Sequence, residues 1–438
     1  MLTFRIMQVL VFVHETTPRV EYIFHHILTN MMGIPIEITS RIDFFEHYAG
    51  PKIAYANTNF NSSTNITPNG LLSQKDVSEQ NITMSKWRGM PIFFGTGTNG
   101  DIPFDLFAAS FYLISRYEEY LPFEPDKHSR FCHNHSLAYR NNFLKIPLVD
   151  LWVKEFSAIF SSKFPKVKIK KTTFRYTPSI DIDNAFAYKH KGFMYALLAT
   201  GKALITGRLK EFNERILVHL NLKNDPYNSY SKLFDILADK KHAIWFILGG
   251  SKSKYDRNIA LNRKSMKNLV QKISERYTVG VHPSYQSYGK PVQIQKEIKA
   301  IENCCNQPVT RSRQHFLRLT LPQTYQHLAQ LGITQDYTMG YSKTIGFRAS
   351  TCTPFKFYDL ECEKELTLAI IPFQVMDRAL LSGEKLNPKT AVAETLRMAR
   401  TVKNVGGHFV TIWHNESLSD AREWKGWSNV FKEIVNGI

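Results

Sequence analysis

The chain has 438 residues, of which 43% are hydrophobic and 13% aromatic, and it carries a formal net charge of +18. This length is sufficient for two domains with separate cores, and the hydrophobic content excludes a disordered protein. The five cysteines are odd in number and lack Cys-x-x-Cys spacing, which excludes a disulfide framework and a cysteine-based zinc module. No apolar run reaches membrane-spanning length, and the N-terminus lacks the features of a signal peptide, so we expect a cytoplasmic protein.

The positive charge by itself would favour nucleic acid as a partner. However, the basic residues are mostly scattered, and no zinc finger, glycine-rich phosphate loop or aromatic RNA-binding signature accompanies them. We therefore expect no nucleic-acid partner.

The N-terminal part, residues 1–171, is predicted to be a small α/β domain. We expect strands at 4–13, 51–56 and 91–95, helices at 17–24, 104–120 and 148–163, and a loop rich in Asn, Ser and Thr at 57–70. Glu118 and Glu119 are expected to face solvent or to pair with an arginine. This part contains no catalytic pattern, so we expect a role in packing or oligomerisation.

Residues 172–438 alternate predicted strands and helices, which is typical of a wound parallel sheet or barrel. The predicted strands end near Asp183, Gly249, His282, His315, Asp336, Asp377 and His414. The predicted helices cover 192–222, 263–276, 292–304, 322–331 and 388–403, and a last helix begins at 424. The segment 184–225 is longer than an ordinary crossover, and we interpret it as a lid over a cleft.

Asp181 and Asp183 form the most informative pattern in the chain. Alternate residues of a strand point to the same side, so both carboxylates lie on one face with Ile182 on the other. Two neighbouring carboxylates repel each other unless a cation or a proton lies between them. The pair therefore indicates a metal site or an acid/base pair, whereas two helix-capping aspartates at a solvated strand end are the alternative.

Three further strand ends carry polar side chains that suit a site. His282 ends one predicted strand, Arg313 and His315 lie on one side of another, and His414 ends a third. A single histidine is more often structural than a ligand, but several polar strand ends are typical of a site at the C-terminal rim of a β/α barrel.

Four short motifs, at residues 179–183, 282–286, 313–316 and 411–414, together resemble those of the polysaccharide deacetylase superfamily. The resemblance runs from about residue 174 to the C-terminus, and the whole chain resembles an uncharacterised bacterial branch with an added N-terminal domain. It implies a deformed (β/α) barrel of polysaccharide-deacetylase type, residues 172–438, preceded by a smaller α/β domain. Two positions depart from the pattern, because Gln286 stands where the family has its second metal histidine and His315 where it has a proline.

The resemblance also implies a divalent metal ion, zinc in the first instance, and a division of roles. Asp183, His282 and His315 would hold the ion, with His315 replacing the missing histidine. Asp181 would be the base, held by Arg313, and His414 the acid, with Asp377 or Glu416 as its partner. The residues assigned to substrate binding are Tyr285, Asp336, Arg348, Asp377 and Glu416. The alternatives are a structural or substrate-contacting His315 with a weakened or lost metal site, and a surface ion pair for Arg348.

The implied reaction is removal of an acetyl group from an N-acetylated sugar or polysaccharide by a metal-activated water. The basic surface would suit an anionic or lipid-linked substrate. Two alternatives remain open: another metal-dependent amidohydrolase or esterase, and a catalytically silent glycan-binding protein, since Gln286 interrupts the histidine pair. The oligomeric state stays open.

Overall fold

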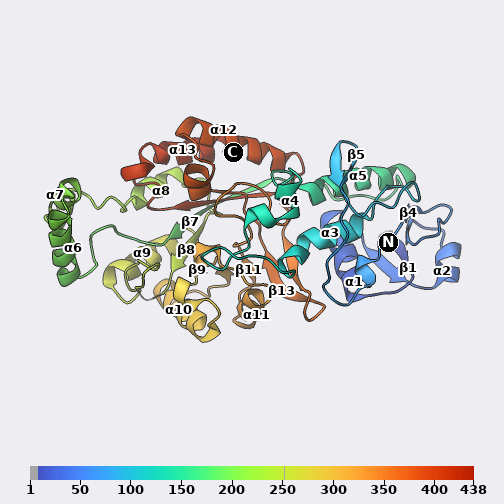
Figure 1. Ribbon diagram of the computed structural model, residues 1–438, viewed down its shortest axis with the longest axis horizontal. Helices are drawn as coiled ribbons and strands as arrows, with labels where there is room; N and C mark the ends of the chain where they lie inside the picture. The colour runs from blue at the N-terminus through green and yellow to red at the C-terminus, as the bar shows by residue number, and fades with distance from the viewer. Residues whose placement is uncertain (1–7, 251) are drawn as a thin grey trace, which may run out of the picture.

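The computed structural model describes residues 8–250 and 252–438, and it confirms the expected α/β class. A small parallel sheet near the N-terminus has the strand order β2-β1-β3-β4, and a larger sheet of nine strands follows it. Figure 1 shows these two parts side by side, with the helices α6 and α7 projecting at the end of the molecule opposite to the N-terminal part.

The small sheet comprises β1 (Val9–Val13), β2 (Ile36–Thr39), β3 (Lys52–Tyr55) and β4 (Thr64–Ile66). Residues 4–7 of the predicted first strand lie outside the described residues. The prediction of a loop at 57–70 was wrong in part, because the buried Thr64 and Ile66 place β4 beside β3. The strand predicted at 91–95 is shorter than expected, since β6 (Met90–Ile92) pairs only with β5 (Ser85–Trp87).

The N-terminal helices begin with α1 (Pro18–Phe24), which Thr17 caps and which continues into the π-helix η1 (His25–Met31). Asp105 caps α3 (Leu106–Ile114) by accepting a hydrogen bond from the backbone N–H of Ala108. The remaining helices here are α2 (Ile42–His47), α4 (Leu137–Arg140) and α5 (Leu148–Lys163).

The helix predicted over 104–120 ends early at Ile114. Arg116 adopts a left-handed conformation with φ of 58°, and the 3₁₀ turn η3 (Tyr117–Glu119) follows it. In this conformation the Arg116 guanidinium donates to Glu118 and Glu119, both at 2.8 Å. The prediction that these glutamates pair with an arginine is confirmed, and both are buried.

The large sheet has the order β12-β13-β11-β10-β9-β8-β7-β15-β14, and every neighbouring pair is parallel except β12–β13. Among the described residues, the edge strands β12 and β14 are not hydrogen-bonded to each other, so the sheet is open between them. The strands are β7 (Arg175–Ile182), β8 (Ile244–Leu248), β9 (Thr278–His282), β10 (Arg311–Ser312), β11 (Gln335–Asp336), β12 (Phe355–Asp359), β13 (Lys364–Ile370), β14 (Val375–Met376) and β15 (His408–His414).

Five of the helices that accompany this sheet agree closely with the predicted ones, whereas α8 (Tyr230–Ile236) was not predicted. The five are α9 (Lys264–Ser274), α10 (Pro291–Cys305), α11 (Gln323–Gln330), α12 (Pro388–Lys403) and α13 (Trp427–Gly437). Two strand predictions were wrong. The run 366–377 divides into β13 and β14, which belong to different regions of the sheet, and His315 lies in the 3₁₀ turn η6 (His315–Leu317) after β10.

Ion pairs that are buried or partly buried connect the two parts of the molecule. Arg348 donates to Glu119 at 2.6 Å, so the alternative of a surface ion pair for Arg348 was wrong. Arg19 of α1 similarly donates to Glu363, in the turn between β12 and β13. One continuous apolar cluster also spans both parts. The predicted boundary near residue 172 falls in the extended segment between α5 and β7 and stays a prediction.

The segment predicted as one helix over 192–222 forms two helices, α6 (Phe193–Ile205) and α7 (Leu209–His219). Gly207, with φ of 68°, lies in the turn between them. The segment does not lie over the sheet as a lid in this structure, because both helices stand away from the body (Figure 1).

Within the described residues, no helix combines the length and apolar character needed to cross a bilayer.

Candidate metal centre

The carboxyl ends of neighbouring parallel strands bring the predicted polar residues to one edge of the large sheet. In the registers of this sheet, His414 of β15 lies opposite Asp181 of β7, and His282 of β9 lies opposite Leu248 of β8. Asp183 follows β7 directly. The rim that the sequence predicted is therefore formed by β7, β9 and β15, with η6 beside them.

Three predicted ligands form the centre of this rim. One donor atom from each of Asp183, His282 and His315 lies within 4.8 Å of the other two. His282 Nε2 is 3.2 Å from Asp183 Oδ1, and His315 Nε2 is 3.3 Å from Asp183 Oδ2. Zinc ligands at their usual bond lengths in a tetrahedron are separated by about 3.3 Å, so these spacings fit a single ion.

The outer nitrogens of both histidines have acceptors that fix the orientation of the rings. His282 Nδ1 donates to the backbone carbonyl of Arg313, and His315 Nδ1 donates to Asp256 Oδ1 at 2.8 Å. With Nδ1 donating in each ring, Nε2 is the nitrogen directed toward Asp183, and in the neutral imidazole it would offer its lone pair to a metal ion. This is the arrangement that metal-binding histidines usually adopt.

Sequence reasoning missed Asp256. Its carboxylate also accepts hydrogen bonds from Ser253 Oγ at 2.7 Å and from the backbone N–H of Tyr285 at 2.8 Å. Asp256 lies in the connection that follows the predicted strand 242–249, so the strand-end argument used for His282 could have found it.

Asp181 and Arg313 form a buried ion pair next to the three ligands. Arg313 Nη1 donates to Asp181 Oδ1 at 2.6 Å, and the guanidinium lies over the ring of Phe246, 4.3 Å from its centroid. The other carboxylate oxygen, Asp181 Oδ2, is 3.8 Å from His282 Nε2. Arg313 thus fixes one oxygen of the carboxylate and leaves the other directed toward the ligands.

His414 also lies close to Asp183, at 3.6 Å between its Nε2 and Asp183 Oδ2. Its Nδ1 donates to Asp377 Oδ1 at 2.9 Å, so Asp377 is its partner, and Glu416 instead accepts from Arg378. Burial alone would lower the pKa of His414, but Asp377 and Asp183 outweigh this effect and raise it to about 10. His414 is therefore protonated at neutral pH.

Burial and neighbouring charges also have opposing effects on the pKa values of two candidate ligands, His315 and Asp183. Burial would lower the pKa of His315, yet the carboxylates of Asp183 and Asp256 raise it to about 9. Burial would raise the pKa of Asp183, whereas the neighbouring histidines hold it well below its usual value. A metal ion entering here would displace a proton from His315.

One unpartnered atom tests whether these residues fit a cation. Among the described residues, Asp183 Oδ1 is buried without a hydrogen-bond donor. A buried carboxylate oxygen without a donor is costly, and a divalent ion bound to Asp183, His282 and His315 would satisfy it. One carboxylate and two imidazoles are a donor set that zinc and related metals accept. The residues fit the implied metal.

Two residues assigned to substrate binding lie elsewhere with partners of their own. The buried Asp336 accepts from Ser312 Oγ at 2.7 Å and from Thr338 Oγ1 at 2.9 Å. The buried Arg348 pairs with Glu119. Their charged groups are thus bound within the protein, and the substrate roles of Asp336 and Arg348 stay predictions.

Tyr285 packs against Tyr255, and its hydroxyl lies 3.2 Å from His128 Nδ1. Gln286, which follows it in the turn η5 (Tyr285–Ser287), is exposed. His315, in contrast, is buried and belongs to the cluster of candidate ligands.

Comparison with known proteins relates the N-terminal part to one family. Residues 9–165 match a family of unknown function, DUF7033. No curated protein matches the chain.

Several solved structures are similar over about three fifths of the chain. A candidate polysaccharide deacetylase from Mycobacterium smegmatis is 14% identical over 61% of this chain and 84% of its own, with a TM-score of 0.39. A polysaccharide deacetylase from Bacillus cereus is 11% identical over 61% and 87%, with a TM-score of 0.28. A 7,8-dihydropteroate synthase from Vibrio fischeri is 9% identical over 60% and 92%, with a TM-score of 0.29. Similarities this distant carry no functional argument.

Proposed function

We propose that the protein is a metal-dependent hydrolase that removes an acetyl group from an N-acetylated sugar or polysaccharide. The observation that carries this proposal is the cluster of Asp183, His282 and His315, with the Asp181–Arg313 pair and the Asp377–His414 pair next to it. A carboxylate and a protonated imidazole that flank a cation site are the groups that hydrolysis of an amide requires.

The substrate class rests on the order of the four motifs along the chain, which resembles that of polysaccharide deacetylases. The position of Gln286 weakens that resemblance at one ligand. His315 offers a replacement at the same cluster, which supports a working site over a silent one.

A bound divalent ion would supply an activated water and would polarise the acetyl carbonyl. Asp181, with one oxygen fixed by Arg313, is placed to accept the proton of the attacking water through its other oxygen. His414 is placed to donate a proton to the departing amine, because the carboxylate of Asp377 beside it favours its charged form. Asp377 orients the imidazole of His414 and stabilises its charge.

Metal binding is the first test. Isothermal titration of the metal-free protein with zinc should give one site per chain, and His315→Ala should weaken it by about 100-fold or more, since one of three ligands is lost. The exposed His242, just before β8, provides a matched control, and His242→Ala should bind as the wild type does. Equal affinity in His315→Ala would remove His315 from the ligand set.

Substrate class is the second test. The metal-loaded protein should release acetate from acetylated amino sugars in preference to acetyl esters of unmodified sugars. Preference for the esters would identify an esterase in the same site. A protein that binds zinc and sugar without releasing acetate would contradict the proposed hydrolysis.

A further inference from the structure

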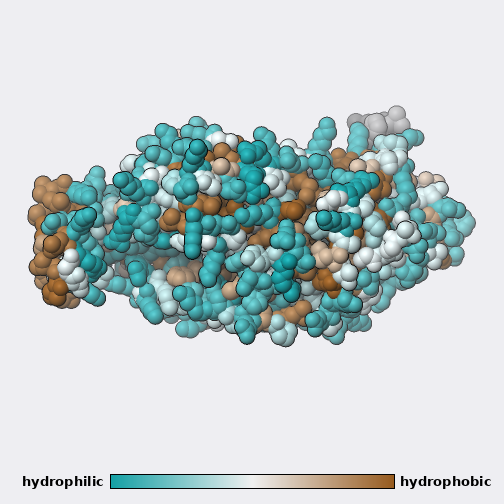
Figure 2. Space-filling model, turned by 45° about the horizontal axis from the view of Figure 1, so that its top comes forward, coloured by the Kyte–Doolittle hydropathy of each residue, from teal (hydrophilic) through white to brown (hydrophobic). Residues whose placement is uncertain are grey.

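The hairpin of α6 and α7 exposes hydrophobic side chains to an extent found nowhere else in the described chain. The described chain has fifteen exposed large hydrophobic residues, and eleven of them lie between 193 and 222. Among these eleven are Phe193 at 82% and Ile205 at 87% exposure. Figure 2 shows this apolar surface as a continuous brown patch at one end of the molecule. Exposed patches of this kind mark surfaces that contact another apolar phase.

The two helices contribute little to the core of the protein. Their main packing partner is each other, and Ala203 and Val218 are the residues buried within them. The thirteen residues of α6 contain a single charged side chain, Lys202. At 1.5 Å per residue α6 is about 20 Å long, too short to span a bilayer but suited to lie within its interface.

The charge around the apolar patch is strongly positive. Residues 189–223 contain seven lysines and arginines against two glutamates, a net charge of +5. Next to the hairpin, the connection after β8 and the start of α9 form a basic collar of six exposed residues: Lys252, Lys254, Arg257, Arg263, Lys264 and Lys267. Lys252 joins the two features, because its Nζ lies 3.4 Å from the ring centroid of Tyr195 in α6.

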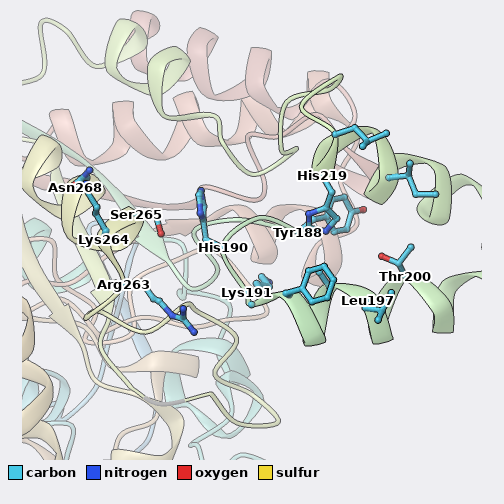
Figure 3. A pocket seen from close by; sticks show the side chains of 15 residues that line it. Tyr188, His190, Lys191, Leu197, Thr200, His219, Arg263, Lys264, Ser265 and Asn268 are labelled. Atoms are coloured by element: carbon cyan, nitrogen blue, oxygen red, sulfur yellow. The ribbon is translucent and has the colours of Figure 1, made fainter.

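A cavity of about 1050 Å³ separates the hairpin from α9 (Figure 3). Leu197 and Ile216 contribute apolar surface from the hairpin, whereas Arg263 and Lys264 of the collar contribute positive charge from the other side. Lys191 also lines the cavity. An amphiphile with an anionic head group and an apolar chain matches both sides.

We propose that the α6–α7 hairpin anchors the protein to an anionic phospholipid surface. The apolar face of the hairpin inserts among the acyl chains near the head groups, and the basic collar contacts the lipid phosphates. A second copy of this chain is the competing occupant, but it would bring the same positive charges against each other. The proposal rests on the hairpin and the collar and is independent of the proposed hydrolysis.

Co-sedimentation with vesicles tests the anchor. The wild-type protein should sediment with vesicles of phosphatidylcholine and phosphatidylglycerol, and much less with phosphatidylcholine alone. The double variant Leu198→Glu/Ile205→Glu should lower the partition coefficient by at least about tenfold, because both charges would enter the apolar layer.

Val292 of α10 provides the matched control, since its exposure of 66% equals that of Leu198. The variant Val292→Glu should bind vesicles as the wild type does. Equal binding by the wild type and the double variant, or no binding by the wild type, would overturn the proposal.

The collar is tested separately with Arg263→Glu/Lys264→Glu. This variant should weaken binding to the anionic vesicles by about tenfold, and raised salt should abolish the difference from the wild type. Light scattering addresses the competing occupant. A wild-type dimer that Leu198→Glu dissociates, together with no vesicle binding, would overturn the membrane proposal in favour of self-association.

Discussion

The candidate metal centre and the α6–α7 hairpin depart from ordinary protein architecture in opposite ways, although one candidate ligand lies close to the hairpin in the chain. Asp183 is only ten residues before Phe193. At the centre, charged groups are buried among partners of opposite charge. At the hairpin, apolar side chains are exposed.

Both arrangements are energetically unfavourable, and the stability of the fold requires neither of them. Buried charges lose hydration, and their mutual attraction offsets that loss only with good geometry. Exposed apolar side chains gain nothing from folding. Residues placed against these rules are expected at functional sites. The comparison therefore supports both proposals, hydrolysis at the rim and attachment at the hairpin.

The largest effect is expected from Asp181→Asn. This change removes the proposed base but keeps the shape of the side chain. It leaves the three candidate ligands unaltered. Turnover should fall by about 10⁴-fold, whereas zinc affinity and vesicle binding should stay at wild-type values. Acetate release, calorimetry and co-sedimentation measure the three properties. Retained activity would exclude Asp181 as the base.

Asp377→Asn should lower turnover by about 10³-fold and should also change its pH dependence. His414 must be protonated to act as the acid, and Asp377 contributes to raising its pKa to about 10. Without that carboxylate the pKa of His414 falls, so the alkaline limb of the rate profile should move to lower pH. A profile with the same alkaline limb would contradict the assigned partnership.

The buried His414 can be compared with a second buried histidine, on whose pKa no neighbouring carboxylate acts. His26 in η1 is buried, and burial lowers its pKa to about 4. Between pH 6.5 and 4 the unfolded chain binds this proton and the folded chain does not, so stability falls as the pH falls through this window. The contribution is about 3 kcal/mol. His26→Leu should remove this part of the stability difference between pH 7 and pH 4, as measured by urea unfolding at the two pH values. The control His25→Leu, at an exposed position, should not remove it.

The smallest effect is expected from replacing residues 193–219 with a short glycine-serine linker. Because α6 and α7 pack mainly on each other, the free energy of unfolding should change by less than about 1 kcal/mol. Zinc affinity should be unchanged, and vesicle binding should be lost. A large loss of stability or of zinc affinity would show that the two regions are coupled.

Local patterns in the chain predicted a substantial share of this structure. The helices α5 and α12 have the predicted bounds. The alternation of Asp181 and Asp183 around Ile182 predicted a polar strand end, and the same reasoning selected His282 and His414. These features depend on periodicity over a few residues, which the chain encodes directly.

Other features depend on segments that are distant in the chain. The run 366–377 contains two strands because β13 pairs with β11 and β12, whereas β14 pairs with β15. The pairing of Arg348 with Glu119 joins residues 229 positions apart. Such register and pairing depend on which surfaces meet, and no local pattern specifies them.

The same distinction between local pattern and tertiary structure applies to the candidate metal centre and to the α6–α7 hairpin. The amino-acid sequence by itself determined which residue types end the strands and that residues 193–205 are almost entirely apolar. Only the tertiary structure decided that Asp256 orients His315, and that the apolar helices face solvent instead of a core. The physical reason is that burial and ligand geometry are properties of the assembled fold, in which each side chain acquires its neighbours.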